Sequence, residues 1–306
     1  MNLSNIRAQA RTVRSQTRGI FLLFAAPTLV SILSILLSLK DNLRDSIPSL
    51  TFSQSIYLLI SKNLFPTTIQ FILTLLLLSA SYTMMKVLRK TKDDVGFSDI
   101  GQLFTSKTFT PVFKTVLLKH LLIFLWNIPM FCGSLLAIFN AYKILSITEK
   151  IPAHTVVTAQ SAAGQQILQY TPGMLLGSLL IFTGLGIAIP QYYAYAQAEF
   201  ILYDQLEAGS YQGAFYAIRQ SRKLMKGYKG KLFMLNLSFI GWNLLARLTY
   251  GLLNFIVLPY TATAYILFYE ELKKEKTISK ENNPQAQDSK KHCNCRNSKL
   301  IDKRNI

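Results

Sequence analysis

Six stretches of the chain are long and apolar enough to cross a lipid bilayer, and they decide the solvent in which the protein folds. A helix that spans about 30 Å of hydrocarbon needs about 20 mostly apolar residues. Inside lipid, a helix satisfies all of its backbone polar groups within one segment. We therefore predict an all-α, polytopic membrane protein with six transmembrane helices. The expected spans are Gly19–Leu39, Leu64–Met85, His120–Tyr142, Met174–Tyr203, Leu232–Leu248 and Leu252–Tyr269.

The composition agrees with a membrane location. Only 16% of the 306 residues are charged, whereas soluble domains average about 25%. The net charge of +18 would suggest nucleic acid as the partner of a soluble protein. In a polytopic protein, the same excess is typical of cytoplasmic loops that face anionic lipid head groups. We therefore expect membrane lipids as partners, with anionic head groups foremost, other membrane proteins as a further possibility, and no nucleic acid.

The positions of the lysines and arginines predict the orientation. With the N-terminus inside, 27 of the 33 cations fall in the inside segments 1–18, 86–119, 204–231 and 271–306. Such an excess identifies the cytoplasmic side, so both termini are expected there. The first apolar stretch has 21 residues and no small-residue cleavage site after it, which favours a retained span over a signal peptide. The expected domains are a cytoplasmic segment 1–18, a membrane domain 19–271 and a charged, disordered cytoplasmic tail 272–306.

Residues that could support catalysis or ion coupling are scarce. Within the expected spans, the candidate intramembrane polar residues are Glu199 and Arg247. Ionisable groups in a membrane are functional candidates by default, but Glu199 lies near the inner end of its span. We expect it to pair at the interface with a lysine or arginine from 219–231. No catalytic residue, and hence no enzyme activity, is predicted.

Metal and cofactor sites are not expected either. His120, His154 and His292 lie far apart in the predicted topology, and no HExxH motif occurs. In the tail, His292, Cys293 and Cys295 offer three soft ligands, one fewer than a structural zinc site usually needs. The third cysteine, Cys132, falls within an apolar span.

A short internal repeat is a possible sign of a duplicated transporter. The sequence Gly-Ser-Leu-Leu occurs at 133–136 and again at 177–180. A repeat of four residues is too short to support an inverted-repeat architecture.

The strongest local pattern lies between residues 210 and 231. Ser210 is expected to cap a helix with one apolar face, formed by Tyr211, Ala214, Phe215, Ile218 and Met225. Cations follow on the other side, and Gly227 is expected to end the helix. Such a helix rests on a cytoplasmic lipid surface or binds an anionic lipid or a partner. The candidate binding residues are Arg219, Arg222, Lys223, Lys226, Lys229 and Lys231.

The C-terminal third resembles a bacterial integral-membrane family, domain of unknown function 975. The resemblance rests on Ser221 to Gly227, Leu237 to Trp242, Pro259-Tyr260 and Phe268-Tyr269. It implies a six-span protein of the bacterial cell membrane. The family is also similar to the membrane portion of some glycerophosphodiester phosphodiesterases, which lacks their catalytic domain. No reaction comes with the resemblance.

Together these patterns favour a non-enzymatic protein that binds lipids or membrane proteins, in envelope stress or in protection from membrane-active peptides. The alternative is a transporter or channel for an amphipathic or lipid-like solute. A third reading, a lipid-modifying enzyme, has only Glu199 as an acid or base. A cavity lined by Glu199, Arg247 and tyrosines would favour the alternatives, whereas a close-packed bundle would favour the first reading.

Overall fold

The computed structural model describes residues 2–44, 52–152 and 157–281, and within these ranges the protein is all-helical and contains no strand. The predicted fold class is confirmed at this level. The helices, in chain order, are α1 Leu3–Gln16, α2 Ile20–Leu23, α3 Ala25–Arg44, α4 Phe52–Leu88, the 3₁₀ helix η1 Phe97–Phe104, α5 Ser106–Thr148, α6 Ala162–Tyr195, α7 Ala198–Glu207, α8 Ala214–Leu224, α9 Lys229–Ser238, α10 Ile240–Leu248 and α11 Asn254–Glu281.

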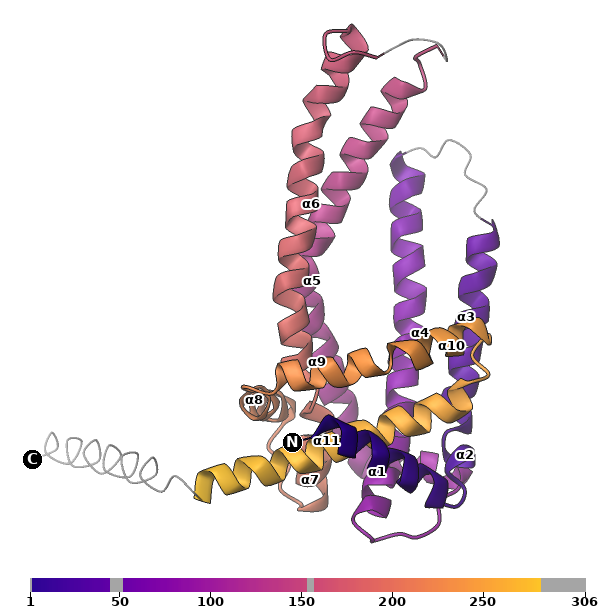
Figure 1. Ribbon diagram of the computed structural model, residues 1–306, viewed down its shortest axis with the longest axis vertical. Coiled ribbons are helices and arrows are strands. Elements are labelled where there is room, and N and C mark those ends of the chain that lie inside the picture. Colours follow the sequence, from indigo (N-terminus) through magenta and orange to yellow (C-terminus); the bar gives the residue numbers. More distant parts are fainter. Residues whose placement is uncertain (1, 45–51, 153–156, 282–306) are drawn as a thin grey trace, which may run out of the picture.

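Two long hairpins, α3–α4 and α5–α6, stand upright on a layer of crossing helices (Figure 1). Three helical segments of the described chain are long and apolar enough to cross a membrane: Pro66–Leu88, Lys107–Thr148 and Ala162–Glu207. A shorter apolar segment, Ala25–Ser38, lies in α3. The first four expected spans therefore fall mainly in the upright helices, although the first begins in α2 and the fourth ends in α7.

Three glycines bring α5 and α6 close together. A Cβ on Gly133 would lie 2.7 Å from the carbonyl oxygen of Gly177, and one on Gly177 would lie 2.9 Å from that of Gly133. At Gly184 a Cβ would approach the backbone nitrogen of Met130 to 2.6 Å. Small residues allow such backbone approach where the surrounding lipid provides no hydrophobic drive for association. The Gly-Ser-Leu-Leu repeat therefore marks the contact between two paired helices.

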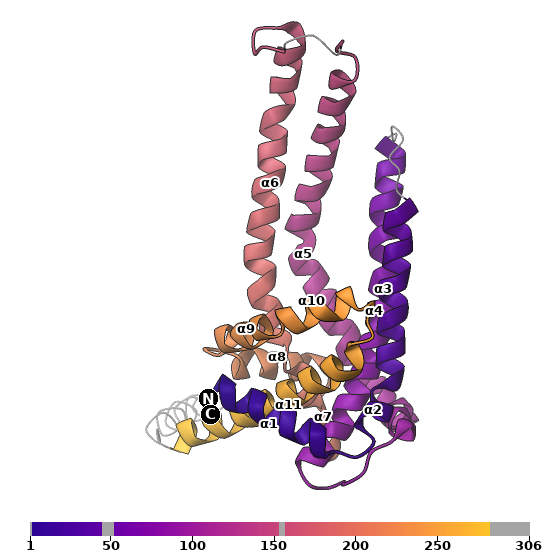
Figure 2. The same ribbon diagram turned by 45° about the vertical axis from the view of Figure 1, so that its right-hand side comes forward.

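The last third of the chain departs from the six-span prediction. The expected fifth span is interrupted at Phe239, and its two parts, α9 and α10, have 10 and 9 residues. Both, together with α11, run across the direction of the upright hairpins in two views (Figures 1 and 2). A tight turn at Gly251, with φ of +88°, joins α10 to α11.

Helix α11 is a core element of the crossing layer. Its side chains Ala264, Phe268 and Leu272 are fully buried and share a cluster with Ile6 and Ala10 of α1. This burial explains why an apolar run of spanning length can lie across the hairpins, because protein covers it on the side of α1. The tail was expected to begin at residue 272, but α11 continues to Glu281.

Much of the α5–α6 hairpin has little protein around it. Only 6% of the most apolar 18-residue stretch within Lys107–Thr148 is buried. Large side chains such as Phe124, Leu175 and Phe182 are exposed. The main core lies at the other end, where Met84 and Met85 of α4 meet neighbouring helices. An apolar surface of this kind, on helices of this length, is typical of a protein whose upper half is solvated by lipid.

Candidate functional site

Helix α8 lies against α5 and the end of α6, and the three helices enclose an apolar groove of about 400 Å³. We call it the arginine groove, because Arg219 and Arg222 both line it. Trp126 forms part of its wall and donates a hydrogen bond from Nε1 to the Tyr195 hydroxyl, at 3.0 Å. The remaining lining residues are Leu122, Leu125, Phe215 and Ile218.

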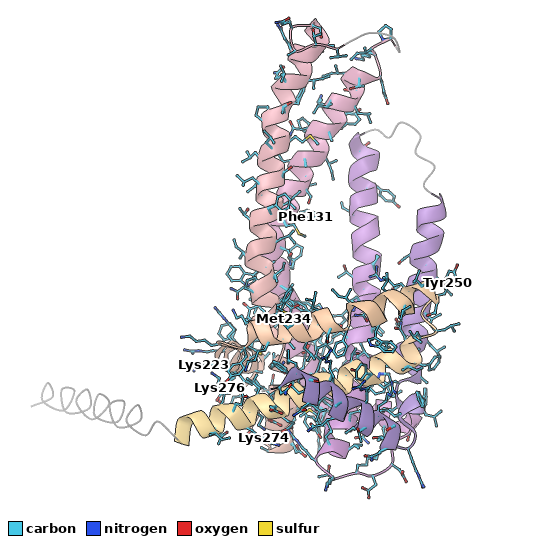
Figure 3. The ribbon with its side chains drawn as sticks, viewed as in Figure 1. Phe131, Lys223, Met234, Tyr250, Lys274 and Lys276 are labelled. Atoms are coloured by element: carbon cyan, nitrogen blue, oxygen red, sulfur yellow. The ribbon has the colours of Figure 1, made fainter. Side chains whose placement is uncertain are left out.

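Of the six candidate cations, the structure brings only two into this groove. Lys223 on α8 and Lys226 in the turn after it are exposed but do not line the groove. Figure 3 shows Lys223 at the outer edge of the crossing layer. Lys229 and Lys231 belong to α9, and the Lys231 Nζ lies 5.0 Å from the centre of the Tyr228 ring. The expected basic patch is therefore divided between two helices.

The helix also differs from the prediction at its start and on its apolar face. It begins at Ala214 after Gly213, whose φ of +101° suits glycine, so Ser210 does not cap it. Ile218 and Met225 are 2% and 0% exposed and pack against the protein. Phe215 is 66% exposed at the groove. Two of the five predicted apolar residues therefore hold the helix to the protein, whereas Tyr211, which precedes α8, and Phe215 remain exposed.

A second hollow, of about 360 Å³, lies on another side of α5, among α4, α6, α7, α9 and α11. We call it the ion-pair cavity, because Lys119 and Glu199 line it and their Nζ and Oε1 atoms lie 2.7 Å apart. Glu199 was expected to pair with a cation from 219–231, and this prediction was wrong. Helix α6 ends at Tyr195 and α7 begins at Ala198, so Glu199 lies on a new helix that contacts α5.

Arg247 does not belong to this cavity. It lies exposed on α10 and is absent from the lining. The two intramembrane polar candidates therefore do not meet. Tyrosines do line the cavity, as the transporter reading required, namely Tyr192, Tyr193 and Tyr265.

The polar groups of the cavity are unevenly satisfied. The Tyr265 hydroxyl donates to Asn236 Oδ1 at 2.7 Å, and Asn236 Nδ2 donates to the Tyr193 hydroxyl at 3.1 Å. His120 Nδ1 lies 2.8 Å from the carbonyl oxygen of Val116. Gln197 is 1% exposed, and its Oε1 has no hydrogen-bond partner among the described residues. Buried acceptors are nearly always paired, so this oxygen leaves the wall of the cavity incompletely satisfied.

A charge network that the sequence analysis missed joins α4, α7 and α11. Arg89 donates to Asp204, Glu207 and Glu270 at 2.6–3.0 Å. Lys273 and the Tyr269 hydroxyl both donate to Asp204 at 2.6 Å. Burial alone would lower the pKa of the Arg89 guanidinium, but the bonds to Asp204 and Glu270 outweigh it and raise the pKa. The motif Phe268-Tyr269-Glu270 was the available signal.

The described residues contain no group of three His, Cys, Asp or Glu side chains that could hold a metal ion. His154 and the tail motif His292-Cys293-Cys295 lie outside the described residues. Cys132 is a free, exposed thiol on α5.

The chain belongs to the family described as Protein of unknown function (DUF975), whose model matches residues 1–276. This confirms the resemblance seen in the C-terminal third and extends it over nearly the whole chain. No curated protein and no solved structure matches the chain significantly. The further similarity to the membrane portion of glycerophosphodiester phosphodiesterases stays a prediction.

Proposed function

We propose that this member of the family is a non-enzymatic protein of the bacterial cell membrane that binds anionic phospholipid of the cytoplasmic leaflet in the arginine groove. The observation that carries the proposal is the pairing of Arg219 and Arg222 with a wall of Trp126, Leu122 and Leu125. A guanidinium forms bidentate hydrogen bonds to phosphate, and tryptophan favours the membrane interface. Such a groove suits a phosphate above and the first part of an acyl chain below.

The proposal includes a membrane arrangement with four crossings in place of six. The upright helices α3, α4, α5 and α6 cross the bilayer, and the crossing layer lies at its cytoplasmic side. Exposed apolar side chains on α9 and α10, among them Met234, Trp242 and Leu248, enter the inner interface. An even number of crossings keeps both termini in the cytoplasm. Arg247, which six spans would leave outside, then joins the inside cations, in line with the positive-inside rule.

Attraction to an anionic leaflet acts on every cation of this region, whereas the groove involves only two of them. A cation beside an anionic leaflet gains about 1 kcal/mol wherever it lies, so all six lysines and arginines of the region contribute. Only Arg219 and Arg222 combine this attraction with a preformed apolar wall. Their replacement should therefore weaken lipid binding more than replacement of two neighbouring cations outside the groove.

The test compares two double variants in the purified full-length protein. Arg219→Gln with Arg222→Gln changes the groove, and Lys223→Gln with Lys226→Gln removes the same charge from exposed positions at and just after the end of α8. Phosphatidylglycerol binding is measured by native mass spectrometry after extraction in a neutral detergent. We expect the arginine variant to lose phosphatidylglycerol and the lysine variant to keep most of it. Equal loss in both would reduce the groove to nonspecific attraction and refute the proposal.

A role in envelope protection follows from the same binding. Membrane-active peptides are commonly basic amphipathic helices that need anionic lipid, so a protein that holds such lipid in place opposes them. A deletion strain should become more sensitive to cationic peptides. The wild-type gene and the lysine variant should restore resistance, whereas the arginine variant should not.

Transport of a lipid-like solute is the second candidate, and the ion-pair cavity is the observation that favours it. A transported solute would need the cavity to face both sides of the membrane in turn. In that case Glu199→Gln would abolish accumulation of the solute at normal protein abundance. A static binding site would give no accumulation even in the wild type.

A further inference from the structure

The ion-pair cavity contains more hydrogen-bond acceptors than its own donors use. Gln197 Oε1 is buried and unpartnered among the described residues. The Lys119 bond reaches Oε1 of Glu199, and a carboxylate can accept about four hydrogen bonds in total. His120 Nδ1 lies 2.8 Å from a backbone carbonyl, so this nitrogen already has a partner within the protein. An occupant of this cavity should therefore bring N–H donors.

The charges of Lys119 and Glu199 further limit the kinds of ligand that can bind in the cavity. A simple cation would compete with Lys119 for Glu199, and a simple anion would compete with Glu199 for Lys119. The Lys119 ammonium carries three donors, of which one reaches Glu199. A ligand with a positive and a negative group side by side can bind both residues and leave each charge compensated. Compensation matters here, since both side chains are largely buried.

We propose that the ion-pair cavity binds a zwitterionic head group in which a primary ammonium stands beside a phosphate, as in phosphatidylethanolamine. The ammonium donates to Glu199 and to Gln197 Oε1, and the phosphate accepts from Lys119. A volume of about 360 Å³ suits a head group rather than a whole lipid. Leu77, Ile123 and Leu232 line the apolar part, where acyl chains begin. This site is separate from the arginine groove, and the proposal does not depend on that groove.

The first experiment needs no variant. Affinities of the wild-type, full-length protein are measured by native mass spectrometry for phosphatidylethanolamine and for its mono-, di- and trimethylated forms with the same acyl chains. Each methyl group removes one N–H donor and adds bulk, so affinity should fall at each step. Tight binding of the trimethylated lipid, phosphatidylcholine, would overturn the proposal. Soluble phosphoethanolamine serves as a further probe: binding identifies a free zwitterion as sufficient, and its absence identifies the lipid as the source.

The second experiment uses two glutamines as a matched pair. Gln197 and Gln205 are both buried with an unpartnered Oε1, but Gln205 does not line the cavity. Gln197→Met should weaken phosphatidylethanolamine binding by roughly tenfold or more, because a hydrogen bond to a charged group is lost. It should leave phosphatidylglycerol binding in the groove unchanged.

Gln205→Met is the control and should alter neither affinity. Because both substitutions remove an acceptor that has no partner in the free protein, neither should lower the thermal midpoint by more than a few degrees. Equal phosphatidylethanolamine affinity in Gln197→Met and the wild type would refute the site. If Gln197→Met lost phosphatidylglycerol binding but kept phosphatidylethanolamine binding, the assignment of phosphatidylglycerol to the arginine groove would be refuted as well.

Discussion

The network around Arg89 is expected to hold the crossing layer to the upright hairpins. Arg89 follows the end of α4 and donates to Asp204 of α7 and Glu270 of α11, which come from distant parts of the chain. About a quarter of each of these three side chains is exposed. Glu207 is 44% exposed and adds little. Removal of Arg89 would leave the carboxylates close together with Lys273 as their remaining cation.

The magnitude follows from the two better-buried partners. A hydrogen bond to a charged group contributes about 1.5–3 kcal/mol, and partial exposure favours the lower end of that range. Two such partners give about 3 kcal/mol for Arg89→Met, which keeps the apolar stem. On the scale of soluble domains above 150 residues, this corresponds to a fall in thermal midpoint of about 6–12 °C. Arg89→Lys should lose about half as much, because lysine cannot form the same fork of bonds.

The assay is thermal unfolding of the purified protein in one detergent, with Lys86→Met as the control. Lys86 lies one turn before Arg89, and its Nζ donates to Gln102 in an exposed position. The Lys86→Met substitution should shift the thermal midpoint by no more than about 2 °C. A double-mutant cycle of Arg89→Met with Glu270→Gln should give a coupling of at least about 1 kcal/mol. An Arg89→Met midpoint within about 2 °C of the wild type would show that the network does not hold the layers together.

Three further predictions concern packing, topology and acid stability. Gly177→Val should lower stability by about 1–3 kcal/mol in thermal unfolding because its Cβ meets backbone of α5, whereas Gly186→Val, with open space around it, should not. Figure 3 shows Tyr250 at the end of the crossing layer. In intact cells that express a cysteine-free background, an impermeant maleimide should label Ala159→Cys but not Tyr250→Cys. Labelling of both positions would support the six-span topology instead. Burial alone would raise the pKa of Asp99, but hydrogen bonds to its carboxylate lower that pKa below the unfolded value of about 3.9. The ionised Asp99 carboxylate therefore stabilises the fold above about pH 4, and this stabilisation is lost as the pH falls through the pKa of Asp99 in the folded state. The free energy of chemical unfolding of Asp99→Asn should therefore depend less on pH, between about 5 and 3, than that of the wild type.

The upright hairpins could be predicted because their composition admits few alternatives. A run such as 120–142 contains enough apolar residues to span a bilayer and lies in a helix, α5, as expected. The crossing of α11 could not be predicted in the same way. Phe268 and Leu272 are as apolar as any lipid-facing residue, and only their burial in the cluster shared with Ile6 reveals a core helix. Hydropathy measures the avoidance of water and does not distinguish lipid from protein as the alternative.

The candidate sites show a similar division. Arg219 and Arg222 could be proposed from the sequence because charge and helical period are local properties. The partner of Glu199 was missed because Lys119 lies 80 residues earlier, and a break after Tyr195 redirects the chain between them. Gln197 gave no signal at all, since an unpartnered acceptor is defined by what surrounds it and not by its neighbours in sequence.

The Lys119–Glu199 pair carries a physical argument for a ligand that does not depend on any motif. A buried ion pair is often no more stabilising than apolar residues of the same size, because both charges lose their hydration. In the described structure this pair lines a cavity together with Gln197, whose buried Oε1 has no hydrogen-bond partner. Three polar groups that add little to stability therefore converge on one hollow. A fold that needed only to be stable would fill this space with apolar side chains, so the arrangement is best explained by an occupant that satisfies all three groups.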